Sequence, residues 1–255
     1  MKKIALITGA TSGLGKSIAL RLAKEGYNVI ITGRRKERLE ELEKEIEIKY
    51  ESKVFSLSFD VRSYDQVAKA IGSLPEEWKA IDVLVNNAGL AAGLDPIFAG
   101  DVDDWEQMID TNIKGLLYVT RTVSPDMVAR KSGHIINIGS IAGKGVYPDG
   151  AVYCATKYAV NALSQGLRMD MLPYGIRVTQ ICPGAVETEF SLVRFKGDQS
   201  RADQVYTGYE NLIADDIADA VYYAVSQPPH VDIQDMLVMP TAQATGNMFY
   251  KEEKN

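Results

Sequence analysis

A tyrosine and a lysine stand four residues apart in the stretch YCATK, at Tyr153 and Lys157. On a helix, side chains with this spacing lie on one face. Free tyrosine, with a pKa of about 10, is a poor acid or base at neutral pH, but a neighbouring cation lowers that pKa. The pair could therefore transfer a proton to or from a substrate oxygen. A tyrosine–lysine pair on a helix surface, without a catalytic role, is the alternative.

A serine precedes this pair by thirteen residues, at the end of the apolar run HIINIGS. Ligands bind at the carboxyl ends of strands in parallel sheets, so the hydroxyl of Ser140 could hydrogen-bond a substrate oxygen. The alternative is that this serine only caps a helix or turn.

Three glycines, Gly9, Gly13 and Gly15, lie in TGATSGLG between an expected strand and an expected helix. Glycine allows a tight turn and lets the backbone approach a pyrophosphate at the positive end of the helix. The spacing G-x-x-x-G-x-G differs from the commonest dinucleotide fingerprint, G-x-G-x-x-G. A glycine-rich turn without a ligand is therefore the alternative.

Two arginines, Arg34 and Arg35, follow the second expected strand. An acidic residue at this place binds the ribose hydroxyls of NAD, whereas an arginine accommodates the additional phosphate of NADP. The guanidinium group suits phosphate oxygens, and its flat face can stack on adenine. Both arginines could instead begin a solvated helix, although the helix dipole favours acidic residues there. The pattern favours NADP.

These residues are positioned by the expected strands and helices. Short apolar runs alternate with longer amphipathic ones along the chain. The short runs are rich in β-branched residues and bounded by Gly, Asn or Asp, which predicts buried strands. They are KIALIT, NVIIT, KVFSLSF, IDVLV, HIINIG, IRVTQI and MLVM. Helices are expected from Leu14 to about Glu25, over the run with Leu39, Leu42 and Ile46, and at roughly 102–129 and 151–173. This alternation predicts an α/β fold with a parallel sheet and helices on both faces.

The chain is expected to form a single domain, 1–255, without internal repeats or linkers. One non-periodic stretch, about 186–212, is too long for an ordinary connection and is expected to be a lid or substrate loop. The C-terminal tail, about 240–255, is expected either to extend across a neighbouring subunit or to fray.

Composition and charge argue against several classes of protein. The 255 residues are 46% hydrophobic, which is enough for one large domain. A net charge of −6 argues against nucleic-acid or anionic-membrane partners. No apolar run approaches the roughly 18 residues of a membrane span. The two cysteines and two histidines form no disulfide framework or metal motif, which suits a reducing cytoplasm and predicts no bound metal.

The motifs together resemble the short-chain dehydrogenase/reductase family, in the family's order and over nearly the whole chain. They are TGATSGLG, NNAG (86–89), TNIKG (111–115), Ser140, YCATK and PGAVET (183–188). The resemblance implies a single Rossmann-type domain with a seven-stranded parallel sheet, assembled as a homotetramer. It also implies catalytic roles: Tyr153 transfers the proton, and Lys157 lowers its pKa and holds the nicotinamide ribose. Ser140 would orient the substrate oxygen, and Asn112 would anchor a water that links Lys157 to solvent.

The same resemblance implies residues around the cofactor. Asp60 and Val61 would contact adenine, Asn87 would support the cleft, and Thr188 would hold the carboxamide. The residues expected at NADP are Gly9, Thr11, Ser12, Gly13, Leu14, Gly15, Arg34, Arg35, Asp60, Val61, Asn87, Tyr153, Lys157, Pro183, Gly184, Val186 and Thr188.

The segments TGRRKERLEEL, NNAGLAAGLDP and TEFSLVRFKGD resemble a narrower branch, the NADP-dependent 3-hydroxy acid dehydrogenases. This implies hydride transfer at the β-carbon of a small acid such as serine, allo-threonine or 3-hydroxypropionate, or at its semialdehyde. The substrate carboxylate needs a cation, and Arg194 could bind it with two parallel hydrogen bonds. The expected substrate residues are thus Ser140, Tyr153 and Arg194, with a surface ion pair between Arg194 and Asp198 as the alternative.

Two other functions remain open. A 3-oxoacyl carrier-protein reductase usually has a glycine-rich turn after the last strand and a basic surface, whereas this chain has DIQDMLVMPTAQ and an acidic balance. A non-catalytic NADP-binding sensor of the same fold would typically lack the tyrosine or the lysine, and both are present.

Overall fold

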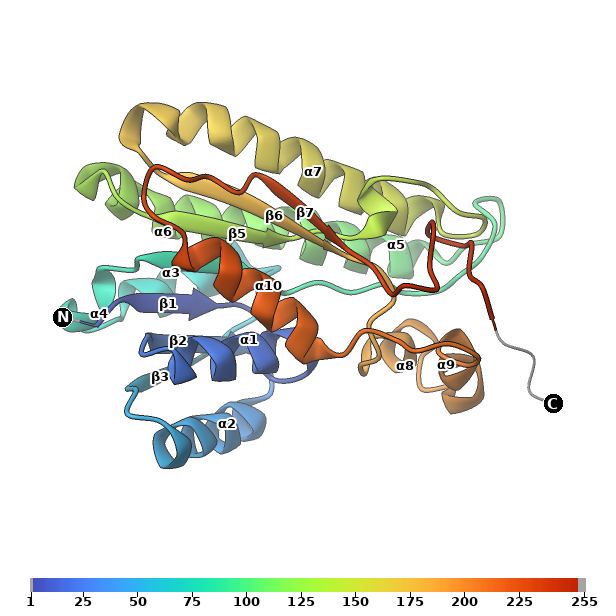
Figure 1. Ribbon diagram of the computed structural model, residues 1–255, viewed down its shortest axis with the longest axis horizontal. Helices are drawn as coiled ribbons and strands as arrows, with labels where there is room; N and C mark the ends of the chain where they lie inside the picture. Colours follow the sequence, from blue (N-terminus) through green and yellow to red (C-terminus); the bar gives the residue numbers. More distant parts are fainter. Residues whose placement is uncertain (1, 252–255) are drawn as a thin grey trace.

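The computed structural model describes residues 2–251, and these form a seven-stranded sheet in the order β3-β2-β1-β4-β5-β6-β7 (Figure 1). Every neighbouring pair of strands runs parallel. The strands are β1 (Ile4–Ile7), β2 (Asn28–Gly33), β3 (Val54–Ser58), β4 (Val83–Asn86), β5 (His134–Ile138), β6 (Arg177–Pro183) and β7 (Asp235–Val238). The predicted α/β fold with a seven-stranded parallel sheet is confirmed. The strand order reverses between β1 and β4, where ligands bind in such sheets.

Helices cover both faces of the sheet (Figure 1). One layer consists of α1 (Gly13–Lys24), α2 (Lys36–Lys49) and α10 (Ala214–Ser226). The other layer includes α3 (Tyr64–Gly72), the short α4 (Glu76–Lys79), α6 (Leu116–Arg130) and α7 (Ala151–Met171). Because both faces are covered, the central strands β1 and β5 are buried along their whole length.

The helix predicted at 102–129 contains an irregular turn. The segment α5 (Val102–Ile109) continues into a π-helical turn, η1 (Asp110–Gly115), before α6 begins. Such turns are frequent at functional sites, and this one carries Asn112. A Cβ atom on Gly115 would lie 2.8 Å from Cγ2 of Val61, so glycine allows the turn to pack closely there.

The stretch 186–212, expected to be non-periodic, contains two short helices, α8 (Phe190–Arg194) and α9 (Gln199–Val205). Asp198 caps α9 by accepting a hydrogen bond from the amide of Arg201, a local signal that hydrophobic periodicity does not detect. We call residues 186–212 the lid segment. Figure 1 shows both helices beyond the carboxyl ends of the strands, on the same side as the C-terminal segment.

Of the C-terminal tail expected at about 240–255, residues 252–255 lie outside the described residues. The described part folds back on itself, because Gln243 forms an antiparallel bridge with Phe249. The extension across a neighbouring subunit stays a prediction.

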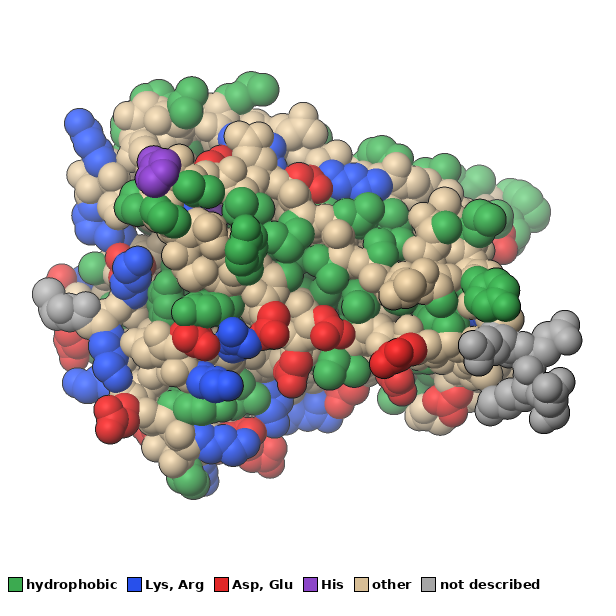
Figure 2. Space-filling model, viewed as in Figure 1, with side chains coloured by type: hydrophobic (Ala, Val, Ile, Leu, Met, Phe, Trp, Pro, Cys, Tyr) green, Lys and Arg blue, Asp and Glu red, His purple; other side chains and the backbone are tan. Residues whose placement is uncertain are grey.

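Acidic and basic side chains are interspersed over α1, α2 and α10, without a continuous basic field on this face (Figure 2). Within residues 2–251, no helix combines the length and apolarity needed to cross a membrane. The same residues contain no group of three or more His, Cys, Asp or Glu side chains suited to a metal ion.

Candidate active site

A cleft of about 800 Å³ opens where β1, β2, β4, β5 and β6 end. The glycine-rich turn and the two arginines line one end of it, and the lid segment lines the other. Of the residues predicted as catalytic, cofactor-binding or substrate-binding, only Gly15 and Asn112 lie outside its lining. The fold therefore brings the predicted residues to one place, although they span more than half of the chain.

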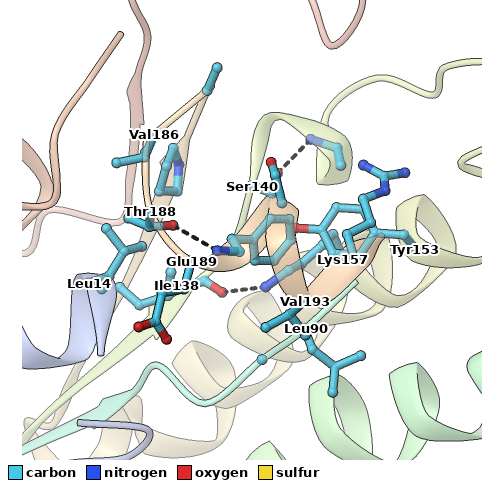
Figure 3. A pocket seen from close by; sticks show the side chains of 18 of the residues that line it. Leu14, Leu90, Ile138, Ser140, Tyr153, Lys157, Val186, Thr188, Glu189 and Val193 are labelled. Atoms are coloured by element: carbon cyan, nitrogen blue, oxygen red, sulfur yellow. Dashed lines mark hydrogen bonds between the residues drawn. The ribbon is translucent and has the colours of Figure 1, made fainter. Parts of the chain in front are cut away.

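Ser140, Tyr153 and Lys157 face the same part of this cleft (Figure 3). Ser140 follows β5, and the other two side chains lie one turn apart on α7. The amine of Lys157 donates a hydrogen bond to the carbonyl of Ile138 at 3.0 Å and lies 5.9 Å from the centre of the Tyr153 ring. The ring of Phe190, from the lid segment, packs edge-on against Tyr153 at 5.8 Å between centres. The tyrosine is therefore held between α7 and the lid.

Burial dominates the pKa values of this pair. It raises the pKa of Tyr153 well above its usual value, and nearby Tyr147 adds to the rise. Burial also lowers the pKa of Lys157 to about 8. We expected Lys157 to lower the pKa of Tyr153, but Ser140 and Arg194 supply the lowering influences in the structure. Burial outweighs them because the phenolate loses its hydration inside the protein.

Asn112 lies behind the cleft wall, and the hydrogen bonds of its side chain stabilise that wall. Its Oδ1 accepts a hydrogen bond from the amide of Leu90 at 2.9 Å, and its Nδ2 donates to the Leu90 carbonyl at 2.8 Å. Nδ2 also donates to Oγ1 of Thr156 at 3.0 Å. The residue thus ties the loop after β4 to α7, and its predicted link to a water stays a prediction.

The glycine-rich turn can adopt its shape only with glycines. Gly9 and Gly13 have positive φ angles of 68° and 51°. A Cβ atom on Gly15 would lie 2.3 Å from the carbonyl oxygen of Gly9, so this position tolerates no side chain. Asn87 braces the turn by donating from Nδ2 to the carbonyl of Thr8 at 2.8 Å. This leaves an open backbone surface at the start of α1, as a pyrophosphate needs.

The two arginines at the end of β2 have different partners. Arg35 donates from Nη2 to the hydroxyls of Thr11 and Ser12, both at 2.8 Å, and so lies over the glycine-rich turn. Arg34 is more exposed and lies 3.8 Å from the carboxylate of Asp60. Helix α2 begins at Lys36, so neither arginine is inside its first turn.

Asp60 and Val61 lie beside Arg34 in the cleft wall. Burial raises the pKa of Asp60, but the hydrogen bonds from Arg62 outweigh this and lower it overall. The carboxylate is therefore ionised at neutral pH, and both of its oxygens accept hydrogen bonds from Arg62.

The residues after β6 form the opposite wall. Pro183, Gly184, Val186 and Thr188 line it, and Thr188 lies against Gly13 across the cleft. Oε1 of Gln243 accepts a hydrogen bond from the amide of Ala185 at 2.7 Å, which fastens this wall to the C-terminal segment.

Arg194 is turned into the cleft from the end of α8. Its Nε donates to the carbonyl of Gly93 at 3.1 Å, and its Nη1 donates to the hydroxyl of Tyr147 at 3.2 Å. Its Nη2 is buried and has no hydrogen-bond partner within residues 2–251. The guanidinium carbon lies 5.7 Å from the centre of the Tyr153 ring. No ion pair with Asp198 is found in the described chain, because that carboxylate caps α9 instead.

Several side chains at the cleft were not predicted from the sequence. Tyr147 is a partner of Arg194, Phe190 packs on Tyr153, and Gln243 fastens a wall from 58 residues away. Arg38 and Glu189 form an ion pair at the outer edge of the arginine end. The only local signal was the closeness of Arg38 to the two predicted arginines, since the other contacts are long-range.

The chain matches the sequence pattern of the family described as short chain dehydrogenase over residues 3–198. It is 48% identical over 242 residues to the NADP-dependent 3-hydroxy acid dehydrogenase YdfG of Escherichia coli (strain K12), covering 94% of this chain and 96% of that protein. It is 43% identical over 252 residues to the NADP-dependent 3-hydroxy acid dehydrogenase of Schizosaccharomyces pombe, covering 98% and 97% of the two chains.

The fold has close counterparts among solved structures. The closed form of a serine dehydrogenase complexed with NADP⁺ has a TM-score of 0.92 and 46% identity, covering 98% of this chain and 100% of that chain. A serine dehydrogenase from Escherichia coli has a TM-score of 0.82 and 43% identity, covering 94% and 99%.

Proposed function

Because the chain belongs to the short-chain dehydrogenase family, we propose that it oxidises the β-carbon of a small 3-hydroxy acid, or reduces the corresponding 3-oxo acid or semialdehyde. The protein is an NADP-dependent oxidoreductase that acts on a CH–OH group, as predicted from its motifs. Serine, allo-threonine and 3-hydroxypropionate are the proposed substrates. The buried Nη2 of Arg194, without a partner in the described chain and close to Tyr153, is the observation that carries this proposal.

The cleft fits the NADP that the relatives bind. The open backbone of the glycine-rich turn suits the pyrophosphate, since positive φ angles and a 2.3 Å clash exclude side chains at that place. We propose that Arg35 binds the 2′-phosphate, because its guanidinium lies between the hydroxyls of Thr11 and Ser12. Arg34, free of such bonds and paired only loosely with Asp60, is placed to stack on the adenine. When bound, the cofactor supplies the nicotinamide that accepts or donates the hydride.

The protein's own residues handle the proton. In the reductive direction, the hydroxyl of Tyr153 donates its proton to the carbonyl oxygen, and in the oxidative direction the phenolate accepts it. Ser140 orients that oxygen through its hydroxyl. Lys157, buried beneath the tyrosine and bound to the Ile138 carbonyl, provides a positive charge next to the phenolate as it forms. Phe190 covers the tyrosine ring and excludes water from the reacting group.

Arg194 would select substrates by their carboxylate. A buried guanidinium with an unused donor is costly unless an anion binds to it, so the site favours a negatively charged substrate. Tyr147 and the Gly93 carbonyl fix the other guanidinium nitrogens and thereby the direction of the free one. A small 3-hydroxy acid, whose hydroxyl is separated from the carboxylate by two carbons, can use Arg194 and Tyr153 together.

An Arg194→Met variant tests the substrate class. We expect KM for carboxylated substrates to rise by about tenfold to a hundredfold, because a charge-assisted hydrogen bond is worth about 1.5–3 kcal/mol. Steady-state assays at fixed NADP with serine, allo-threonine, 3-hydroxypropionate and an uncharged alcohol would measure this. An Arg194→Lys variant is the matched control, since it keeps the charge and loses the planar fork.

The alcohol should be used equally well by the parent and Arg194→Met. An unchanged KM for every acid would remove Arg194 from the substrate site. Tight NADPH binding without turnover of any of these compounds would instead favour the non-catalytic sensor.

We further propose that the protein works in the cytoplasm as a homotetramer. Several large apolar side chains on α6 and α7 are exposed in the single chain, among them Leu117, Tyr158 and Met169. Such surface suits an interface between subunits. Light scattering on the purified protein would measure the mass, and a single-chain mass at micromolar concentration would contradict the tetramer.

A further inference from the structure

Two arginines and one glutamate meet at the outer edge of the arginine end of the cleft. Arg38, on α2, donates from Nη1 to both carboxylate oxygens of Glu189 at 3.0 Å. Arg35 directs its own Nη1 at the same carboxylate, at 3.4 Å. Glu189 belongs to the lid segment and is more than 150 residues away from both arginines in sequence. The lid segment therefore contacts the proposed phosphate site directly.

The donors of Arg35 are divided between two kinds of partner. Nε and Nη2 point to the neutral hydroxyls of Thr11 and Ser12, whereas Nη1 points to the carboxylate of Glu189. Burial raises the pKa of Glu189, but hydrogen bonds from Arg38 and Arg35 lower it overall, so the side chain is an anion at neutral pH. A second anion that reaches Arg35 must bind close to this carboxylate.

We propose that Glu189 is a specificity-determining residue, which competes with the 2′-phosphate of NADP for Arg35. This rests on the proposed cofactor site and is independent of which substrate is used. The carboxylate neutralises part of the charge of Arg35 and repels the phosphate. NADP binding is thereby weaker than Arg35 would otherwise allow, while the binding of NAD, which has no 2′-phosphate, is unaffected.

Glu189 belongs to the lid segment, so its competition with the phosphate also affects how this segment is held. Thr188 precedes Glu189 and lines the cleft, and α8 begins at the next residue with Phe190, which packs on Tyr153. When the phosphate takes Arg35, Glu189 retains only Arg38. The 2′-phosphate therefore loosens one of the contacts that hold the lid segment to the body of the protein.

A Glu189→Gln variant tests the competition by direct binding, without turnover. NADPH affinity, measured by cofactor fluorescence at low ionic strength, should rise by about two- to fivefold, which is the range of an exposed ion pair. NADH affinity should stay the same within error. Glu187→Gln is the matched control, because Glu187 is an exposed acid two residues away that forms no ion pair within the described chain.

An equal change for both cofactors, or weaker NADPH binding in Glu189→Gln, would overturn the proposal, because the glutamate would then only support the site. The same substitution in an Arg35→Met background should leave NADPH binding unchanged. A persisting gain there would show that Arg35 is not the shared partner. If Arg35→Met alone bound NADPH as tightly as the parent, the proposed phosphate site itself would be wrong, which separates the two proposals.

Discussion

The two ends of the cleft are built in different ways. We call the end with the glycine-rich turn and the two arginines the cofactor end, and the end with Arg194 and the lid segment the substrate end. The cofactor end is built from strand ends and from short local turns, such as the turn from Gly9 to Gly15, whose glycines leave no room for side chains or have positive φ angles. The substrate end includes the lid segment, which is joined to the loop after β4 by the contact of Arg194 with Gly93 and to α5 by the contact of Lys196 with Asp104. The first end holds one shape through backbone geometry, whereas the second depends on a few polar contacts that can change with the substrate.

A Tyr153→Phe variant should give the largest effect, because it removes the hydroxyl that we propose as the proton donor. We expect kcat to fall by at least about a thousandfold, near the upper range for acid–base catalysis. NADPH affinity should change little, since the cofactor end keeps its backbone. Single-turnover assays combined with cofactor fluorescence would measure both quantities.

Tyr147→Phe is the comparison for that experiment, since it removes a part-buried hydroxyl that binds Arg194 and leaves Tyr153 in place. If Tyr153→Phe retained near-normal turnover, another group would have to supply the proton. A large loss of NADPH affinity in Tyr153→Phe would show that the tyrosine also contributes to cofactor binding.

The pH dependence should differ between the two directions of reaction. Burial raises the pKa of Tyr153, so the protonated form that reduction needs dominates at neutral pH. Oxidation needs the phenolate, and its kcat/KM should therefore rise up to tenfold per pH unit on the acidic side of that pKa. Reduction should be flat at neutral pH and fall above pH 8, because Lys157, whose pKa is about 8, then loses its charge.

Initial rates in both directions between pH 6 and about 9.5, with NADPH affinity measured at each point, would test this. A flat profile for oxidation would contradict the role of burial in setting the tyrosine's pKa. If NADPH affinity also fell above pH 8, weaker cofactor binding would explain the loss of the reduction rate.

The smallest effect is expected for Lys196→Met, which loosens the lid segment alone. Lys196 pairs with Asp101 at 3.1 Å and with the buried Asp104 at 3.0 Å. Because the amine itself is exposed, we expect KM for the acid to rise only about two- to fivefold, with NADPH affinity unchanged. Lys131→Met, which alters an exposed lysine far from the lid segment, is the control. A larger change in NADPH affinity than in KM would show that the lid segment serves the cofactor end instead.

Much of the cofactor end could be predicted from the sequence, and much of the substrate end could not. The glycine spacing, the arginines after β2 and the Tyr153–Lys157 pair are local patterns, and each reflects a backbone or helix geometry that short sequences determine. Tyr147 and Gln243 were missed because their partners, Arg194 and Ala185, are 47 and 58 residues away. The helices α8 and α9 were missed because five and seven residues are too few to show a period.

The sequence by itself determined the fold class, the seven strands in their order along the chain and the class of cofactor, and it indicated the tyrosine that we propose as proton donor. Hydrophobic periodicity and glycine geometry act over a few residues, so they can be recognised without a fold. Only the tertiary structure decided that burial raises the pKa of Tyr153, that Arg194 has an unused donor, and that Glu189 reaches the arginines. Burial, desolvation and charge pairing depend on which distant segments come together, and that is a property of the folded chain alone.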